Sequence, residues 1–177
     1  MIKKVILLGA LLGLSFAFAQ APVLAMGDSG TTDTSAQKCK KGEVWDKKKK
    51  KCVKAAAGVI PDEDLYQQGR GLAKEGEYEW ALTVLAAVSN QKDPRVLNYT
   101  GYSYRKLGQL EKGIGYYEQA LAIDPNYVLV REYLGEGYVA AGKVDLAKAQ
   151  LVEIASRCGK TCEEYEDLAE AISHAAD

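Results

Sequence analysis

Glycines recur at a nearly fixed interval through the second half of this chain of 177 residues. A step of 34 residues takes Gly101 to Gly135 and Gly108 to Gly142, and a step of 32 residues takes Gly101 back to Gly69. Self-similarity at such a period is typical of repeat architectures, in which each unit buries its apolar face only against its neighbours. The chain is therefore predicted to be a stack of similar units, of which about three or more are needed for stability.

Each unit is predicted to be a pair of helices, because apolar residues at helical spacing begin at Leu65 and continue between the glycines. We expect Gly76, Gly108 and Gly142 at the turns inside the units, where glycine adopts positive φ without strain. Small residues at the other repeated positions let two helix backbones approach closely, while Tyr and Leu fill the adjacent spaces. These small residues are Gly69, Ala81, Gly101, Gly113, Gly135 and Ala147.

The middle unit has small residues, large residues and a final proline at the positions where a known repeat has them. They are Leu97, Gly101, Tyr104, Gly108, Tyr117, Ala120 and Pro125. At these positions the chain resembles the tetratricopeptide repeat, a helix-turn-helix unit of about 34 residues. The resemblance implies an all-α fold, a right-handed solenoid with units at 62–93, 94–127 and 128–159.

A further amphipathic helix is predicted over 163–175, after the third unit. Tyr165, Leu168, Ala169 and Ile172 share one face of this helix at the spacing i, i+3, i+4 and i+7. Such a helix covers the apolar side of the last repeat, which would otherwise meet water. Acidic residues in its first turn also interact favourably with the helix dipole. The repeat domain is therefore expected to span 58–177.

Residues 1–19 have the three parts of a secretory signal peptide. Lys3 and Lys4 precede an apolar run that ends in Ala17-Phe18-Ala19. Cleavage is expected after Ala19, and the small residues that end at Ala21 and Ala25 offer two alternative sites. The alternative is an uncleaved anchor helix, but the run is shorter than the roughly 20 residues that cross a bilayer. Residues 20–37 contain many turn formers and are predicted to be a flexible linker. The mature protein is therefore expected to be exported, either periplasmic or secreted.

Export changes how the four cysteines are interpreted. In an oxidising compartment they most simply form two disulfides, and their spacing favours Cys39 with Cys52 and Cys158 with Cys162. A bond between residues four apart requires the helix to break, and Gly159 supplies the break. The alternatives are a zinc site that uses all four cysteines and a redox dithiol at the second pair. Both lack the usual Cys-x2-Cys spacing.

Residues 38–54 form a basic segment on an otherwise acidic chain. Nine Lys against two acidic residues give it a net charge of +7, whereas residues 55–177 carry a net charge of −8. The Cys39–Cys52 loop is similar, over one loop only, to a piece of small chitin-binding cysteine modules. Trp45 is expected either to cover the disulfide or to contact a sugar or a membrane interface.

The basic segment is expected to act through its charge. Its five consecutive Lys suit an anionic envelope surface, such as lipid headgroups or wall polymers, or an acidic protein. They are Lys47, Lys48, Lys49, Lys50 and Lys51. Nucleic acid is disfavoured as a partner because the protein is expected to be exported.

The sequence predicts no catalytic residues, metal site or cofactor, so we expect a protein that is not an enzyme. His174 is the only histidine and lies three residues from the end, which leaves no histidine-based triad or metal cluster. The pairs Gly69-x-Gly71 and Gly113-x-Gly115 suggest a nucleotide-binding loop, but neither follows a predicted strand.

The resemblance implies a concave groove along the first helices of the units, where a protein segment binds. The implied groove residues are Tyr66, Arg70, Asn98, Tyr102, Arg105, Glu132 and Glu136. The two glutamates would repel a carboxylate, so we expect a peptide whose basic end faces the third unit. The other interpretation of the tyrosines is that they complete the packing between helices.

The expected function is an exported interaction scaffold of the solenoid type. The alternative is a cell-envelope or polysaccharide-anchoring protein that binds through the Cys39–Cys52 loop. In that case the repeats would serve only as a spacer.

Overall fold

A computed structural model describes residues 39–175 of the chain. Within that range it contains seven helices and one two-stranded sheet. The predicted signal peptide and linker lie outside the described residues. No helix in the described range is long and apolar enough to span a bilayer.

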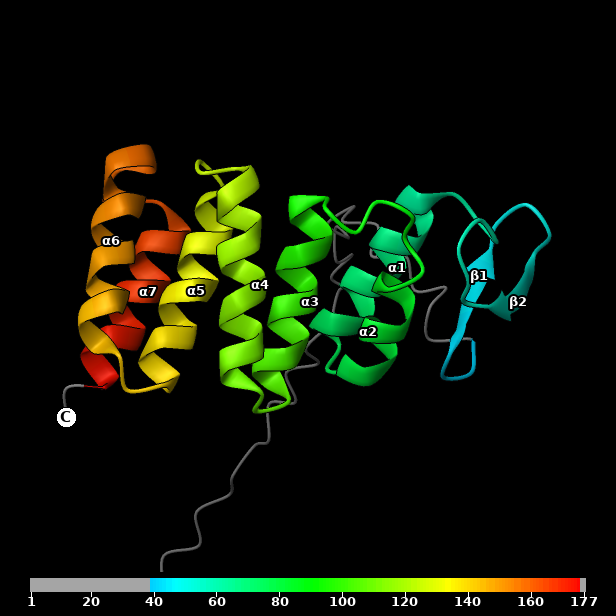
Figure 1. Ribbon diagram of the computed structural model, residues 1–177, viewed down its shortest axis with the longest axis horizontal. Helices are drawn as coiled ribbons and strands as arrows, with labels where there is room; N and C mark the ends of the chain where they lie inside the picture. The colour runs from blue at the N-terminus through cyan, green and yellow to red at the C-terminus, as the bar shows by residue number, and fades with distance from the viewer. Residues whose placement is uncertain (1–38, 176–177) are drawn as a thin grey trace, which may run out of the picture. The chain divides into compact units, whose positions relative to one another are not determined.

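The strand pair and the three helix pairs follow one another in chain order along the stack, and the last helix lies beside the third pair (Figure 1). The first two are the strands β1 (Glu43–Asp46) and β2 (Lys51–Lys54). Three helix pairs follow: α1 (Asp62–Lys74) with α2 (Tyr78–Leu85), α3 (Pro94–Lys106) with α4 (Leu110–Ile123), and α5 (Val128–Ala140) with α6 (Val144–Cys158). The last element is α7 (Glu163–His174). The three predicted helix-turn-helix units and the predicted capping helix are thus confirmed.

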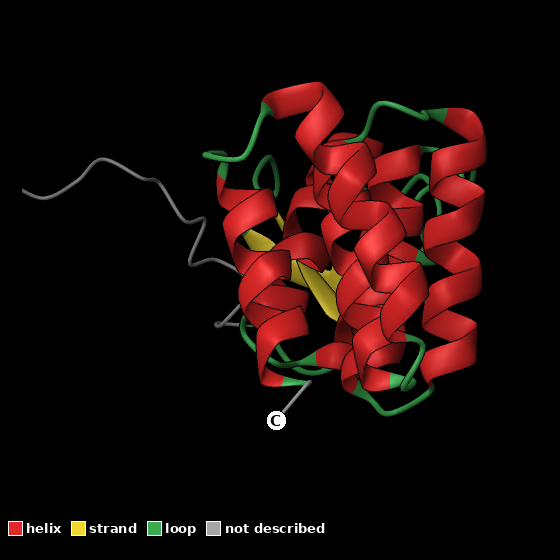
Figure 2. Cartoon of the chain, turned by 90° about the vertical axis from the view of Figure 1, so that its left-hand side faces the viewer, coloured by secondary structure: helices red, strands yellow, loops and turns green. Residues whose placement is uncertain are grey.

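The helices form two layers. Each helix contacts the next one along the chain, and α1, α3, α5 and α7 also contact one another in that order. These four helices make one layer, which we call the inner layer, and α2, α4 and α6 make the other. Figure 2 looks along the stack from the α6 and α7 end, and the two strands are seen behind the helices.

Glycines set the spacing of the helices, as the sequence predicted. A β-carbon on Gly101 would lie 2.9 Å from the ring of Tyr117, and one on Gly113 would lie 2.8 Å from the carbonyl oxygen of Gly101. A β-carbon on Gly135 would lie 2.5 Å from the side chain of Leu168 on α7. The first two contacts hold α3 against α4, and the third lets the capping helix approach α5.

The basic segment forms a hairpin that packs on the first helix pair. Its strands pair antiparallel, with Val44 opposite Val53 and Trp45 opposite Cys52. Val44 is 1% exposed and belongs to the same apolar cluster as Leu65 of α1. The hairpin thus shares the core of the helices. It covers the first helix pair as α7 covers the last.

Hydrogen bonds fix the hairpin on the helices. The backbone N–H of Trp45 donates to Oε1 of Gln68 at 2.7 Å, and Nε2 of Gln68 donates to the carbonyl oxygen of Trp45 at 3.1 Å. Nε1 of Trp80 donates to the carbonyl oxygen of Glu43 at 2.9 Å. Because Gln68 and Trp80 lie on α1 and α2, the position of the hairpin is set by both helices of the first unit.

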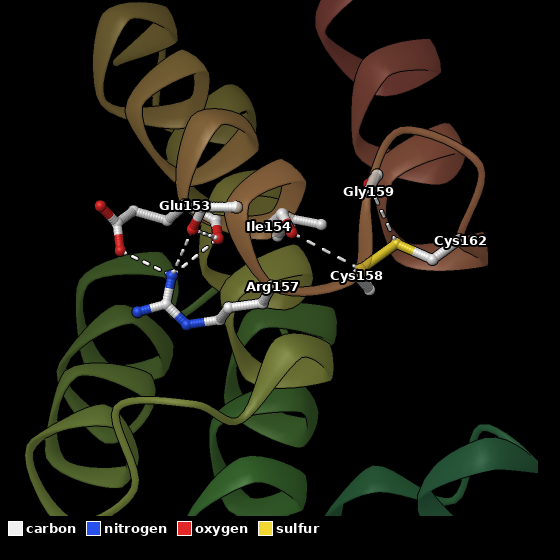
Figure 3. The surroundings of a disulfide bond; sticks show 7 residues. Glu153, Ile154, Arg157, Cys158, Gly159 and Cys162 are labelled. Atoms are coloured by element: carbon white, nitrogen blue, oxygen red, sulfur yellow. Dashed lines mark hydrogen bonds and ion pairs between the residues drawn. A yellow bond between two sulfur atoms is a disulfide. The ribbon is translucent and has the colours of Figure 1, made fainter.

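Both predicted disulfides form, Cys39–Cys52 with Cα atoms 5.6 Å apart and Cys158–Cys162 with Cα atoms 6.0 Å apart. With the sulfurs bonded in these pairs, the cysteines are not available as thiolates to hold zinc. The predicted break between α6 and α7 is also present, because Gly159 has a φ of +85° (Figure 3).

Candidate functional site

Tyrosines from α1, α3 and α5 form a continuous row in the inner layer. The ring centroids of Tyr66 and Tyr99 are 6.2 Å apart, those of Tyr99 and Tyr102 are 6.2 Å apart, and those of Tyr102 and Tyr133 are 5.2 Å apart. Tilted and edge-to-face pairs of this kind stabilise each other by about 0.5–1.5 kcal/mol beyond the area they bury. The row therefore joins three units with rigid aromatic side chains.

Arginines lie over this tyrosine row. The guanidinium carbon of Arg95 is 4.5 Å from the ring centroid of Tyr66, and that of Arg70 is 5.7 Å from the ring centroid of Tyr99. Nε of Arg70 also donates a hydrogen bond to the Tyr99 hydroxyl at 3.1 Å. These contacts hold the cationic groups in place beside the aromatic rings.

The predicted groove residues differ widely in exposure. Tyr66 is 6% exposed, Asn98 has no exposed surface, and Tyr102 is partly buried. Neither polar atom of the Asn98 amide has a hydrogen-bond partner within residues 39–175. The second interpretation of the tyrosines, as packing residues, is thus favoured for Tyr66.

Arg105 and Glu136, both predicted for the groove, form an ion pair. Nε of Arg105 also donates to the hydroxyl of Tyr117 at 3.3 Å. The charge of Glu136 is therefore balanced inside the protein. Glu132 differs, because no hydrogen bond or ion pair reaches its carboxylate from the described part of the chain.

A cleft of 260 Å³ opens among the helices of the inner layer. Its lining comes from all four of them: Arg70, Lys74, Tyr99, Leu129, Glu132, Tyr133, Glu163, Glu164 and Asp167. Two of these residues, Arg70 and Glu132, were predicted from the sequence as groove positions. The cleft is thus basic on the α1 side and acidic on the α5 and α7 side.

The carboxyl group of Glu132 has an unusual environment. The residue is 5% exposed. Burial first, and then the negative charges of Glu136, Asp167 and Glu164, raise its pKa to about 8. The guanidinium of Arg105 acts in the opposite direction. The consequence is a cleft glutamate that is mostly uncharged at neutral pH.

The acidic residues of α7 were not predicted as part of the site. Glu163, Glu164 and Asp167 lie in the first turns of the capping helix, where acidic residues have a simpler explanation in the helix dipole. No feature of the sequence says that α7 packs on α5 with this turn facing the cleft. The excess of acidic residues in that turn is the only local signal that could have indicated the site.

The lysine run of the hairpin lies at its tip. Lys48, Lys49 and Lys50 are exposed, in the turn between β1 and β2. The carboxylate of Asp46 accepts hydrogen bonds from the backbone N–H groups of Lys48 and Lys49 at 3.0 and 2.9 Å. These bonds, that of Lys49 first, lower the pKa of Asp46. Trp45 lies opposite Cys52 and packs against the shared core.

Comparison with known proteins supports this architecture. The family model of the tetratricopeptide repeat matches residues 94–127, the same boundaries as the predicted middle unit. Among solved structures, the crystal structure of MamA, a tetratricopeptide repeat protein, aligns with a TM-score of 0.56 and 18% sequence identity. That alignment covers 65% of this chain and 68% of the MamA chain. No curated protein matches the sequence. The chain thus contains a tetratricopeptide repeat at residues 94–127, and the helix pairs on either side of it stack in the same fold.

Proposed function

We propose that this protein is an interaction scaffold that binds a segment of another protein along the inner layer of α1, α3, α5 and α7. The cleft lined by all four helices carries the proposal, because it places aromatic and charged side chains of several units against one ligand. Tetratricopeptide repeat proteins are typically scaffolds that do not catalyse reactions. The chemistry of the cleft, with tyrosines beside charged groups, is suited to binding a peptide.

The proposal includes export to an oxidising compartment. Two closed disulfides support this part, because such bonds are uncommon in reducing compartments. The secretory features of residues 1–19 support it independently. The protein is isolated from separate cell fractions and analysed by mass spectrometry. We expect a mature N-terminus after residue 19, or shortly after it, and both disulfides intact. A full-length reduced protein in the cytoplasm would contradict export.

Site-specific crosslinking tests the binding face. A photoreactive amino acid replaces Tyr133 in the cleft or, as the control, Val152 on α6, which is 68% exposed. We expect the Tyr133 position, but not the Val152 position, to crosslink to one defined peptide of a partner protein. Crosslinks mainly from the Val152 position would place binding on the layer of α2, α4 and α6 and overturn the proposal.

A second candidate function is binding of an anionic envelope surface through the hairpin tip. The exposed lysines and the net charge of +7 on residues 38–54 favour it. The test uses the full chain, because the hairpin shares its core with α1 and α2. Sedimentation with vesicles that contain phosphatidylglycerol should be lost when Lys48, Lys50 and Lys51 are replaced by Gln. Unchanged sedimentation of that variant would exclude the tip as the binding surface.

A further inference from the structure

A largely buried glutamate, whose carboxyl group has no hydrogen bond or ion pair among the described residues, lines the inner-layer cleft. Glu132 is only 5% exposed, and it lines the cleft together with Glu163, Glu164 and Asp167 of α7. We call these four residues the acidic pocket. Burial removes most of the water around this residue, so its carboxyl group favours a ligand that supplies hydrogen bonds or an opposite charge.

The cations near the acidic pocket do not neutralise it. Arg105 is paired with Glu136, and Arg70 donates to the Tyr99 hydroxyl. Lys74 and Arg70 line the same cleft, yet within residues 39–175 neither forms an ion pair with an acidic residue of the pocket. The pocket therefore has a negative charge that the folded chain leaves unbalanced.

Resting on the function proposed above, we infer that the acidic pocket receives one basic side chain, a lysine or an arginine, of the bound protein segment. Its ammonium or guanidinium group would supply the hydrogen bonds and the charge that Glu132 lacks. The methylene stem of that side chain would pack against Tyr133, Tyr99 and Leu129, which line the cleft beside the acids.

The other end of the cleft limits the number of basic residues in the ligand. Arg70 and Lys74 repel a second cation, so a single basic residue fits better than a basic run. A run of lysines, such as the one in the hairpin of a second copy, is thus disfavoured.

Binding of the cation should be coupled to loss of a proton. The carboxyl of Glu132 faces Glu136 on its own helix, Glu163, Glu164 and Asp167 on α7, Arg105 on α3, and Arg70 and Lys74 on α1. Its pKa of about 8 means that the empty pocket holds a proton at neutral pH. A cation favours the ionised form. Affinity should therefore rise between about pH 6 and pH 9, a range in which lysine and arginine stay charged.

Peptide libraries on the full chain test the inference. Four libraries of acetylated, amidated octapeptides carry random uncharged residues around one fixed central residue: Lys, Arg, norleucine or Glu. Retention on the immobilised oxidised protein is measured for the wild type, Glu132→Gln, Asp167→Asn and the matched control Glu166→Gln. Glu166 is exposed on the same helix as Asp167 and does not line the cleft.

We expect the Lys and Arg libraries to be retained more strongly than the norleucine and Glu libraries. Glu132→Gln should weaken that retention about ten-fold, a change that corresponds to the loss of one charge-assisted hydrogen bond. The same variant should also remove the rise of retention with pH. Asp167→Asn, at an exposed position that folding tolerates, should weaken it about two- to five-fold. Glu166→Gln should leave it unchanged.

Four outcomes would overturn the inference. The first is retention of the norleucine library as strong as that of the Lys library. The second is a loss in Glu166→Gln as large as in Asp167→Asn, which would indicate only the general negative charge of the domain. The third is retention of the Glu library as strong as that of the Lys library; if the added variant Tyr133→Ala then loses both, the binding face stands and the cation pocket fails. The fourth is that no library is retained by the wild type, in which case the binding face proposed above fails as well.

Discussion

Two glycines of α4 allow a matched test of how the repeats pack. Gly113 and Gly115 lie two residues apart in the same helix, and each can be replaced by Ala. A β-carbon on Gly113 would lie 2.8 Å from the carbonyl oxygen of Gly101 and 3.1 Å from the backbone nitrogen of Arg105. A β-carbon on Gly115 would meet no atom of the described structure within 4 Å.

The magnitudes depend on these two environments. Alanine in a helix interior is favoured over glycine by about 0.8–1.0 kcal/mol, so Gly115→Ala should raise the free energy of unfolding by about that much. Gly113→Ala has the same gain, but its methyl group meets backbone atoms that cannot rotate away. Overpacking of this kind costs typically about 1–3 kcal/mol. Because the two nearest backbone atoms would lie only 2.8 and 3.1 Å away, we expect a cost in the upper part of that range, about 2–3 kcal/mol, and therefore a net loss of about 1–2 kcal/mol. The two variants should thus differ by about 2–3 kcal/mol.

Thermal and urea unfolding of the oxidised full chain, followed by circular dichroism at 222 nm, measures both effects. For a domain of this size 1 kcal/mol corresponds to about 4 °C, so Tm should rise by about 4 °C in Gly115→Ala and fall by about 4–8 °C in Gly113→Ala. Equal stability of the two variants would refute the reasoning, because it would mean that α3 and α4 do not approach closely at this position.

Four further predictions concern single contacts and can be checked in the same unfolding assays. Gln68→Ala should lower the free energy of unfolding by about 2 kcal/mol, because it removes both hydrogen bonds to the hairpin; no loss would mean that the hairpin is only loosely attached. Asn98→Leu should raise it by about 1–2 kcal/mol, since the buried amide has no partner among the described residues; a loss would reveal an unrecognised partner. Replacing Cys39 and Cys52 by Ser should cost about 3 kcal/mol for the loop that the bond closes, and equal urea midpoints with and without the bond would contradict this. Burial raises the pKa of Glu132 from 4.5 to about 8, so the folded state binds a proton that the unfolded state has lost; stability should fall as pH rises through that window, and Glu132→Gln should flatten the fall.

The repeat architecture could be predicted because its information is local and periodic. Gly108 and Gly142 have φ values of +78° and +71° at the turns where the period placed them. The break before α7 could be predicted for a similar reason, because a bond between Cys158 and Cys162 cannot form across a continuous helix.

The candidate site was predicted only in part. The repeat register identified Arg70 and Glu132 as inner positions, and both line the cleft. The same register also indicated Asn98, which has no exposed surface. Position within a repeat gives the side of the helix on which a residue lies. It does not give the depth at which neighbouring helices cover it.

The sequence by itself determined the helix pairs and the turns inside them, where backbones can approach and how many units stack, because glycine spacing and apolar periodicity act within about one repeat length. Only the tertiary structure decided that the hairpin joins the core of α1 and α2, and that the first turn of α7 completes an acidic pocket with Glu132. Trp45 meets Gln68 across 23 positions of the chain, and the lining of the cleft joins α1 to α7. Such contacts depend on which surfaces are left uncovered once all the helices have packed, and no local pattern encodes that outcome.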